Sequence, residues 1–385
     1  MEAIGKTPIT VKARAMKQFL LGKKDYLPKK ETNADLDLIM KCALCPNMCR
    51  FDCPVSEAAK TETLSPAGKS RLALLFETGH LEAEKVKDIL YNCCNCDSCK
   101  QWCPFDFSLG DLLIGVHQDL VEKEHIPDNV LKIKEELNDN HIIGENKFKK
   151  TSKKEQAEVL YFMGCSVRAD QKEIAESMIN IFEKIDEDYT FINDEWCCGA
   201  PLYKLGFKDE FKEYAEKNIK DLKKTGCKTL LCSCPTCADI IKNIYPEIGV
   251  NTDIEILHTS EYLKKITKDK KLNDVDKKCV YHDPCTLVRN LNITEEPREI
   301  LNNIPKLKLK DPYFSKQNTQ CCGRGGSLSK INEKLSETIT KKRVQDLHRD
   351  SDVIITSCPT CKTAFEKQKS KVYDISEIVD MALKD

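Results

Sequence analysis

The stretch LLCSCPTCADI, residues 230–240, occurs a second time in altered form as IITSCPTCKTA, residues 354–364. Two segments upstream of it repeat in the same order: VLYFMGCSVR (159–168) as CVYHDPCTLVR (279–289), and CCGAPLYKLG (197–206) as CCGRGGSLSK (321–330). The copies lie 120 residues apart at their first cysteine and 124 residues apart at each of the four later cysteines. Such regular spacing indicates a tandem duplication within residues 159–385.

Each copy alternates short apolar runs with amphipathic segments, a pattern typical of an α/β unit with a mostly parallel sheet. Strands are expected at Val159–Met163, Tyr189–Ile192, Thr229–Cys232, Ile254–Leu257, Val280–His282, Val353–Thr356 and Val372–Tyr373. Helices are expected at Gln171–Lys184, Asp209–Lys224, Ser260–Ile266, Glu299–Asn303 and Leu328–His348. Ligands of such sheets lie beyond the carboxyl ends of the strands, where the repeated cysteines fall.

Each copy carries five cysteines, here called a pentad: one alone, an adjacent pair followed by glycine, and a Cys-Pro-Thr-Cys. The first pentad is Cys165, Cys197, Cys198, Cys234 and Cys237, and the second is Cys285, Cys321, Cys322, Cys358 and Cys361. A single zinc ion has no use for a fifth thiolate, whereas one of two adjacent sulfurs can bridge two metals. Each pentad therefore predicts a cluster that is not a plain cubane. Gly199 and Gly323 are expected to let the backbone approach the metal, with Pro235 and Pro359 in the first turn of a helix facing it.

Two further cysteine runs precede the repeats. CCNCDSCKQWCP (93–104) has the bacterial ferredoxin spacing, and CALCPNMCRFDCP (42–54) has the same count with one extra residue. Two cubane [4Fe-4S] clusters are predicted, with crossed ligation: Cys42, Cys45, Cys49 and Cys103 on one, and Cys93, Cys96, Cys99 and Cys53 on the other. The alternative is a pair of zinc knuckles. Cys94 is left over, either as a packed thiol or as one that contacts the cluster ligands without binding metal, and Trp102 is expected to shield a cluster from water.

Composition limits the function classes. The 385 residues carry 61 basic and 62 acidic side chains, so nucleic acid is not an expected partner. There are 22 cysteines, without an export signal or an apolar run long enough to span a membrane. We therefore expect a cytoplasmic protein whose thiols bind metal rather than form disulfides. No Gly-x-Gly-x-x-Gly fingerprint is present, so electrons are expected from a flavoprotein or another donor subunit.

The chain divides by composition into five parts. They are a basic N-terminal arm (1–37), a helical ferredoxin-like two-cluster domain (38–143), a charged linker (144–158) and the two α/β copies (159–275 and 276–385). Within the second part, Leu72, Leu75 and Phe76 are expected to form the core face of a helix that ends near Gly79.

The pattern of a cysteine, a CCG and a Cys-x-x-Cys, present twice, resembles the CCG-domain proteins. These include the catalytic B subunit and fused D subunit of heterodisulfide reductase, and the iron–sulfur subunits of glycolate- and lactate-oxidising complexes. The resemblance covers roughly residues 38–385. It implies two noncubane [4Fe-4S] clusters, one per pentad, that face each other across the pseudo-twofold interface of two CCG domains. A small disulfide substrate would be bound between them.

The sequence is compatible with two functions of different classes, and with a third that it favours less. The first is a disulfide reductase, one subunit of a complex, in which the ferredoxin-like clusters feed electrons to the two pentads; the presence of both complete pentads favours it. The second is an electron-transfer subunit of a flavin-dependent 2-hydroxyacid dehydrogenase. Thr286, where heterodisulfide reductases commonly have His, favours the second, and Arg324 also departs from the family pattern. The third is a scaffold for cluster assembly.

Several residues near the pentads have two interpretations each. Arg168 and Arg289, at equivalent places in the copies, either bind an anionic substrate or compensate cluster charge. His282 and Asp283 either tune or protonate a cluster or only order their loop. His258 is expected to begin a helix capped by Ser260 and has no assigned chemistry. Three thiols are expected to be buried small hydrophobes: Cys227, Cys232 and Cys279.

Overall fold

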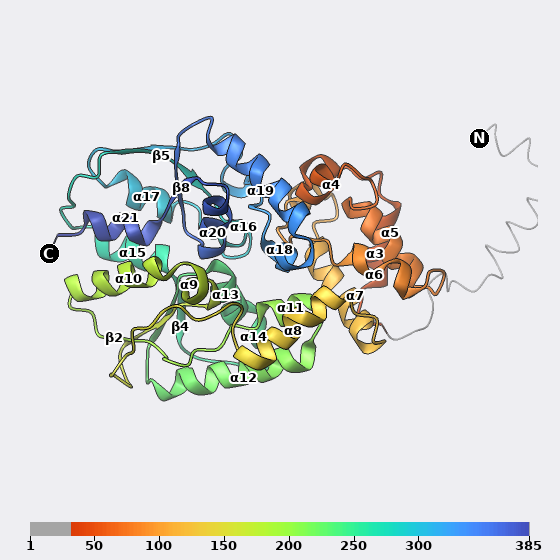
Figure 1. The fold of residues 1–385 in the computed structure, drawn as a ribbon, viewed down its shortest axis with the longest axis horizontal. Helices are drawn as coiled ribbons and strands as arrows, with labels where there is room; N and C mark the ends of the chain where they lie inside the picture. The colour runs from red at the N-terminus through yellow and green to blue at the C-terminus, as the bar shows by residue number, and fades with distance from the viewer. Residues whose placement is uncertain (1–31, 385) are drawn as a thin grey trace, which may run out of the picture.

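The computed structural model describes residues 32–384, so most of the predicted N-terminal arm lies outside the described residues. A helical part occupies one end of the long axis, and two α/β units lie side by side at the other end (Figure 1). This arrangement confirms the predicted class: an N-terminal helical part followed by two parallel-sheet α/β units.

The helical part contains short helices, most of which begin at a side-chain cap or a proline. They are α3 (Leu36–Leu44), α4 (Pro54–Ala59), α5 (Pro66–Glu77), α6 (Lys87–Leu90), α7 (Leu109–Glu122) and α8 (Asp128–Asn140), with 3-10 turns at Arg50–Asp52, Ala83–Lys85 and Cys99–Trp102. Ser65 caps α5 by accepting a hydrogen bond from Gly68 N, with Pro66 at the first helical position. The predicted core face of this helix is wrong at Leu75, which is 39% exposed. The buried face instead runs through Lys69, Ala73 and Phe76.

The two sheets have the same order and are parallel throughout. The first is β2 (Tyr189–Thr190), β1 (Val159–Phe162), β3 (Thr229–Cys232) and β4 (Glu255–His258), and the second is β6 (Leu307–Lys310), β5 (Lys277–His282), β7 (Val353–Thr356) and β8 (Lys371–Asp374). In the central pairs Leu160 lies opposite Leu230, and Val280 opposite Ile354. The sequence prediction missed β6, a half-exposed edge strand of alternating Leu and Lys.

The helices of the first unit are α9 (Cys165–Asp170), α10 (Lys172–Lys184), α11 (Ala200–Leu205), α12 (Lys208–Lys224), α13 (Pro235–Asp239), a π-helical turn (Ile240–Ile244), α14 (Tyr245–Glu247) and α15 (Thr259–Thr267). The second unit contains α16 (Cys285–Arg289), α17 (Glu296–Asn302), 3-10 turns at Lys316–Asn318 and Gly325–Ser327, α18 (Leu328–Ile331), α19 (Glu333–Leu347), α20 (Pro359–Lys367) and α21 (Ile375–Ala382).

Two helix predictions need correction. The helix predicted at Leu328–His348 is broken at Asn332, whose side chain accepts a hydrogen bond from Leu335 N and so caps α19. The cap of α15 is His258 itself, which accepts from Ser260 N, and Ser260 is not the cap. Asp374 caps α21 in the same way, so the repeat extends to these helix starts.

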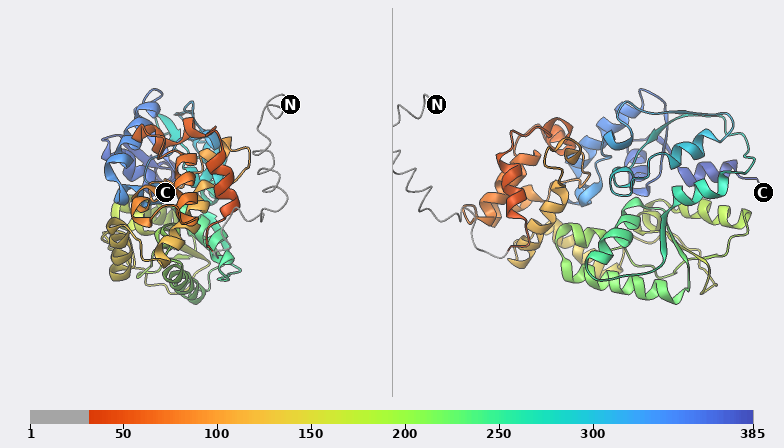
Figure 2. Two further views of the ribbon diagram at one scale, coloured as in Figure 1. Left: turned by 90° about the vertical axis from the view of Figure 1, so that its right-hand side faces the viewer. Right: turned by 180° about the vertical axis from the view of Figure 1, so that it is seen from behind.

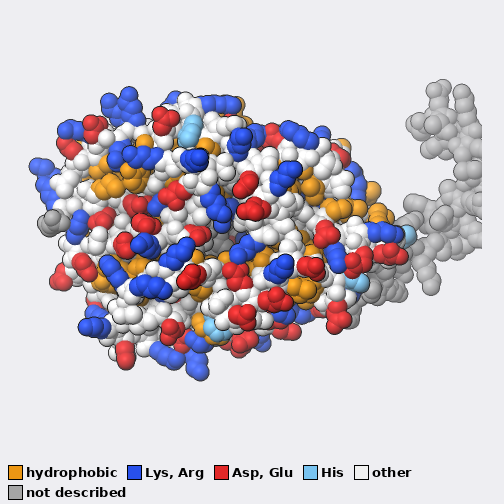
Figure 3. All heavy atoms as spheres, viewed as in Figure 1, with side chains coloured by type: hydrophobic (Ala, Val, Ile, Leu, Met, Phe, Trp, Pro, Cys, Tyr) orange, Lys and Arg blue, Asp and Glu red, His pale blue; other side chains and the backbone are white. Residues whose placement is uncertain are grey.

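The units share their hydrophobic cores. One core runs through both α/β units, with Phe182 of α10 and Ile378 of α21 among its buried members. Another joins the helical part to the first unit, since Leu113 of α7 and Leu205 of α11 belong to it. Figure 2 shows the helical part against one end of the paired units. Basic and acidic side chains are intermingled over the face in Figure 3. Among the described residues no helix is long and apolar enough to cross a membrane.

Candidate functional site

Four of the predicted ligands lie where strands end, as expected for parallel sheets. Cys165 opens α9 after β1, and Cys285 opens α16 after β5. Cys234 and Cys358 are the N-caps of α13 and α20, each followed by proline at the first helical position. Each unit therefore brings two distant cysteines to one edge of its sheet.

The first pentad is closely packed and held by its backbone. The Sγ atoms of Cys165 and Cys197 are 3.9 Å apart. The amide of Cys197 donates to His141 O, at the end of α8, over 2.8 Å. Asn218 Nδ2 donates to Cys197 O (2.9 Å), and Tyr245 Oη donates to Cys198 O (2.9 Å). Hydrogen bonds from Cys197 and Cys237 lower the pKa of Cys198, so these thiols interact directly.

The second pentad has the same build. Hydrogen-bonding contact with Cys285 and Cys322 raises the pKa of Cys321. The pKa of Cys322 is lowered by contacts with Cys321 and Cys361. Thr340 Oγ1 of α19 donates to Cys322 O over 2.7 Å and fixes the cysteine pair against the helix.

The glycines after the cysteine pairs serve the backbone, and the expectation that they make room for the metal needs correction. Gly199 and Gly323 have φ of 78° and 93°, in the left-handed region that favours glycine. A Cβ at Gly199 would lie 2.9 Å from Phe211 Cδ2, and one at Gly323 would lie 2.7 Å from Ser336 O. The glycines therefore let the cysteine loop approach α12 and α19. Gly164 is the one that faces a ligand, because its Cβ would lie 3.1 Å from Cys237 Sγ.

Both pentads open on one shared pocket of about 170 Å³. Nine of the ten pentad cysteines line it, all except Cys321. Contact with Cys234 raises the pKa of Cys358, so the pentads meet across the interface of the two units. Ser166 and Thr360, one from each unit, share a hydrogen bond of 3.1 Å at the same interface. The pocket also has a cationic and polar lining that includes Lys204, Thr286, Arg324 and Lys330.

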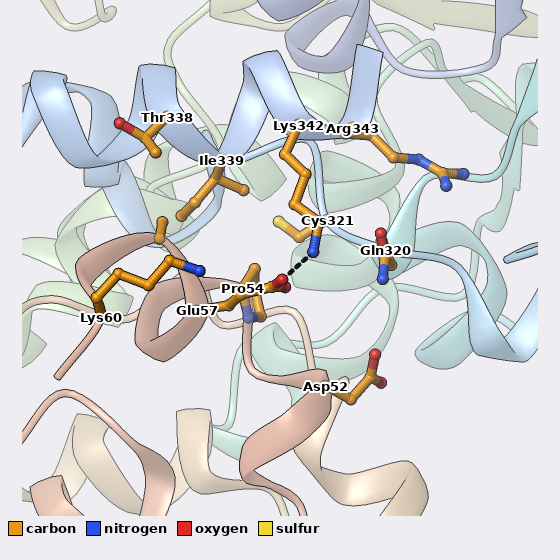
Figure 4. A pocket seen from close by; sticks show the side chains of 11 residues that line it. Asp52, Pro54, Glu57, Lys60, Gln320, Cys321, Thr338, Ile339, Lys342 and Arg343 are labelled. Carbon is orange, nitrogen blue, oxygen red and sulfur yellow. Dashed lines mark ion pairs between the residues drawn. The ribbon is translucent and has the colours of Figure 1, made fainter. Parts of the chain in front are cut away.

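Cys321 instead lines a second cavity of about 110 Å³, drawn in Figure 4. That cavity is formed by α4 of the helical part and α19 of the second unit. Glu57 and Lys342 form an ion pair across it. The helical part therefore contacts the second pentad at this cavity as well.

The N-terminal cysteines fall into two neighbouring groups. Burial raises the pKa of Cys42 to about 11, and three further thiols, Cys49, Cys45 and Cys103, act on it in the same direction. Burial likewise raises the pKa of Cys53 to about 12, with additional contributions from Cys93 and Cys96. Cys49 and Cys99 hydrogen-bond to each other and so connect the groups.

Lys69 is a functional candidate that sequence reasoning missed. It is fully buried, and its Nζ donates to Asn92 O over 2.9 Å. Burial alone would lower its pKa, but the thiols of Cys93, Cys53 and Cys99 outweigh burial and raise it. The signal that could have identified Lys69 from the sequence is its place on the buried face of α5, where a lysine is unusual.

The loop of residues 93–96 touches the second unit directly. A Cβ on Gly325 would lie 2.1 Å from Cys94 O, and one on Gly326 would lie 2.1 Å from Cys93 O, so only glycine permits this approach. The side chains of Cys94 and Cys96 contact Cys321. Cys94, predicted to be a packed thiol, is indeed buried, and it also lines the shared pocket.

The repeated arginines do not line the shared pocket. Arg168 bonds to Glu195 and to the carbonyls of Ile192 and Asn193. Arg289 donates to the carbonyls of Cys96, Gln317 and Thr319, and so ties the cysteine loop to the second unit. Both are held by backbone carbonyls, and the structure does not support a substrate-binding role.

Three other side chains have clear local roles. Asp283 accepts from both Arg298 Nη atoms at 2.8 Å and from Lys316 N at 2.7 Å, so it orders its loop. Trp102 is 46% exposed, which leaves much of the ring in water, and its Nε1 donates to Asp52 Oδ2 over 3.1 Å. The three thiols expected to be buried hydrophobes, Cys227, Cys232 and Cys279, are all buried.

The donor set fits iron–sulfur clusters better than a single ion. Thiolate sulfur is the ligand that holds such clusters, and N–H donors near the sulfurs tune them. His282 Nε2 and Arg343 Nη1, both beside the second pentad, are buried without a partner among the described residues. Within residues 32–384, no three or more His, Cys, Asp or Glu side chains are grouped to hold one metal ion.

Comparison with known families agrees with this organisation. The 4Fe-4S dicluster domain family matches residues 39–107. The CCG family, described as a cysteine-rich domain, matches twice, at residues 159–242 and 279–366.

Curated relatives share this organisation at low identity. The B subunit of the fumarate reductase (CoM/CoB) of Methanothermobacter marburgensis is 28% identical over 99% of this chain and 80% of its own length. The D subunit of the dihydromethanophenazine:CoB–CoM heterodisulfide reductase of Methanosarcina mazei is 28% identical over 82% of this chain and 83% of its own. The EtfAB:quinone oxidoreductase of Syntrophomonas wolfei is 28% identical over 59% of this chain and 34% of its own.

Among solved structures, glutamate racemase RacE1 of Bacillus anthracis aligns over 58% of this chain and 78% of its own, at 13% identity and a TM-score of 0.29. That TM-score supports no inference about fold or function. The family matches and the relatives in the curated set agree with the cysteine pattern: the chain has one region that matches the 4Fe-4S dicluster domain, followed by two regions that match the CCG domain, and it is similar to subunits of iron–sulfur oxidoreductases.

Proposed function

We propose that this chain is the thiol–disulfide oxidoreductase subunit of an electron-transfer complex, acting on a small disulfide in the pocket shared by its two pentads. The observation that carries the proposal is the convergence of nine pentad cysteines on one pocket between two α/β units.

The cysteines divide into four proposed ligand sets. Cys42, Cys45, Cys49 and Cys103 would hold one cubane [4Fe-4S] cluster, and Cys53, Cys93, Cys96 and Cys99 the other. Each pentad would hold one noncubane [4Fe-4S] cluster, with the adjacent pair Cys197–Cys198 or Cys321–Cys322 providing the bridging sulfur. When bound, these groups would supply electrons one at a time.

The reaction consumes two electrons and two protons and breaks one S–S bond, which yields two thiols. Cysteines of both pentads line the pocket, so each sulfur of a bound disulfide would face one pentad. Eight of the ten pentad cysteines are buried, all except Cys165 and Cys285, and this burial keeps water away from the reacting sulfurs. The same pocket would serve the reverse reaction, in which two thiols are oxidised and the electrons leave through the dicluster domain.

Charge at the pocket favours a substrate with anionic groups. Lys204 and Arg324 contribute cationic side chains, and no Asp or Glu lines the pocket among the described residues. The third cation of the lining, Lys330, is paired with Glu136. Arg324 Nε is also buried there without a partner. Arg324 is one of the positions that depart from the family pattern, and it would bind a carboxylate, sulfonate or phosphate of the substrate.

The proposed partners supply or accept the electrons. The names of two relatives contain CoM and CoB, and a third is an EtfAB:quinone oxidoreductase, so relatives work with different redox partners. A flavoprotein or another electron-donor subunit would therefore dock on this chain. The alternative, an electron-transfer subunit of a flavin-dependent 2-hydroxyacid dehydrogenase, retains one observation in its favour, which is Thr286 in the pocket lining.

The test compares electron entry with turnover in two single variants. Cys197→Ser and Cys321→Ser each remove one cysteine from one pentad, and Cys279→Ser removes a buried thiol outside the pentads as a control. Purified anaerobically, both pentad variants are expected to accept electrons into the dicluster domain yet lose disulfide reduction. Retained turnover in either variant would contradict a site that needs both pentads.

A further inference from the structure

The two pentads differ in the charges around them. Arg343 of α19, beside the second pentad, is among the largest fully buried side chains of the described part. Its Nε donates to His282 Nδ1 (3.3 Å) and its Nη2 to Phe314 O (3.0 Å). Within residues 32–384 no carboxylate forms an ion pair with it. Arg343 is therefore a buried cation without a direct ion pair among the described residues, and Asp283 and Asp346 act on it only over a longer distance.

His282 adds a directed N–H donor at the same place. Because its Nδ1 accepts from Arg343, the ring proton is on Nε2, and Nε2 has no partner among the described residues. His282 and Cys322 interact electrostatically, so this unpartnered donor belongs to a side chain next to the second pentad.

The first unit has no such pair. Phe162 stands at the place of His282, three residues before the first cysteine of its pentad. The contacts of the glycines show which residues of α12 and α19 are equivalent, since Gly199 faces Tyr214 and Gly323 faces Ile339. By this alignment, the residue of the first unit that is equivalent to Arg343 is Asn218, which is uncharged.

An acidic residue of the first unit adds to the difference in charge around the two pentads. Glu195, two residues before the cysteine pair of the first unit, is buried, and its oxygens accept from Met163 N and Gly164 N. Its charge pairs with Arg168 at 3.3 Å. The residue at the same place in the second unit is Thr319, which is neutral. The buried arginine beside the first pentad is thus paired with a carboxylate, as Arg298 is with Asp283 in the second unit, whereas Arg343 beside the second pentad forms no such pair.

We propose that Arg343 and His282 raise the reduction potential of the second pentad's cluster above that of the first, so that electrons from the dicluster domain collect first at the second pentad. Positive charge and N–H donors near the sulfurs stabilise the reduced, more negative state. The proposal rests on the proposed function only in assuming one cluster per pentad. Arg343 and His282 would act as positioning and tuning residues, not as ligands.

The experiment is an anaerobic redox titration followed by electron paramagnetic resonance. The signal that disappears in Cys322→Ser is assigned to the second pentad, and the variants are Arg343→Met, Arg343→Lys and His282→Phe. Lys308→Met, which removes an exposed charge of the same unit, is the control. Arg343→Met is expected to shift the ratio of reduced to oxidised second-pentad cluster at least tenfold toward oxidised, which is about 59 mV for one electron. Arg343→Lys keeps the positive charge and should therefore leave this ratio close to its wild-type value.

The outcomes separate this inference from the proposed function. Pentad signals that do not move in Arg343→Met, or that move together with the signals of every other cluster, would overturn the inference alone. Wild-type protein without pentad signals would overturn the proposed function itself. If Arg343→Met loses its second-pentad cluster, the inference is tested with His282→Phe instead, because Phe is the residue that the first unit has at this place. An unchanged reduction potential of the second-pentad cluster in His282→Phe would also overturn the inference.

Discussion

Replacing Gly325 by Ala would separate the dicluster domain from the second pentad. The new Cβ would lie 2.1 Å from Cys94 O, whereas ordinary contact begins near 3.4 Å. The backbone carbonyl cannot rotate away as a flexible side chain can, so the loop of residues 93–95 must move by about 1.3 Å. Gly325 does not have a left-handed φ, so alanine is compatible with its own backbone and the effect comes from the contact alone.

The expected cost is that of overpacking a well-packed contact, about 1–3 kcal/mol, which for a chain of 385 residues corresponds to a melting temperature lower by roughly 1–4 °C. Electron transfer from the dicluster domain to the second pentad should also slow several-fold, because transfer rates fall steeply with distance. The assays are differential scanning fluorimetry and stopped-flow reduction followed by rapid-freeze magnetic resonance, which times the arrival of electrons at the pentad.

Gly249→Ala is the matched control. Gly249 has a φ of +79° and no atom within 4 Å of its would-be Cβ, so its substitution strains the backbone without meeting a neighbour. It should lower the melting temperature slightly and leave electron transfer unchanged. A Gly325→Ala protein with wild-type stability and wild-type transfer rate would refute the direct contact between the cysteine loop and the second unit.

Three further changes test other parts of the structure. Cys198→Ser and Cys322→Ser should each lower bound iron by about a quarter of the roughly sixteen atoms expected for four clusters, whereas Cys227→Ser should not, as measured by iron analysis of anaerobic protein. Lys69→Met should lower the reduction potential of one dicluster signal, because a buried cation next to Cys53 and Cys93 is lost; an unchanged titration would contradict this role. Burial is the main cause that raises the pKa of Asp374 to about 7, so its contribution to stability is present at acid pH and lost as the pH rises from about 4 through 7. Asp374→Asn keeps the helix cap and should flatten the change of urea midpoint between pH 5 and pH 8, and an unaltered slope would count against it.

Sequence reasoning located the strands of the repeats because their apolar runs are buried on both faces. Thr229–Cys232 and Val353–Thr356 were predicted to the residue. The edge strand Leu307–Lys310 was not predicted, since half of its side chains face water and its hydrophobic pattern is weak. The helix break at Asn332 was not predicted either, because it depends on a side chain that hydrogen-bonds to the backbone.

The cysteine pattern predicted which residues gather at the site, but not how the parts join. Gly325 and Gly326 have no assigned role in the sequence analysis, and the structure shows that they are glycines because a loop more than 200 residues away in the chain packs against them. Arg343 and Lys69 give no local signal other than a charge on a buried helix face. Their roles depend on contacts between distant segments, which periodicity and spacing do not encode.

The most direct measurement is disulfide-dependent oxidation of reduced methyl viologen by the anaerobically purified protein. Small disulfides with anionic groups are expected to be reduced with two viologens oxidised and two thiols released per disulfide. Arg324→Met is expected to raise KM for anionic disulfides more than for uncharged ones. Protein that takes up electrons readily into all of its clusters, yet reduces neither kind of disulfide and oxidises no thiol pair, would contradict a thiol–disulfide site between the pentads.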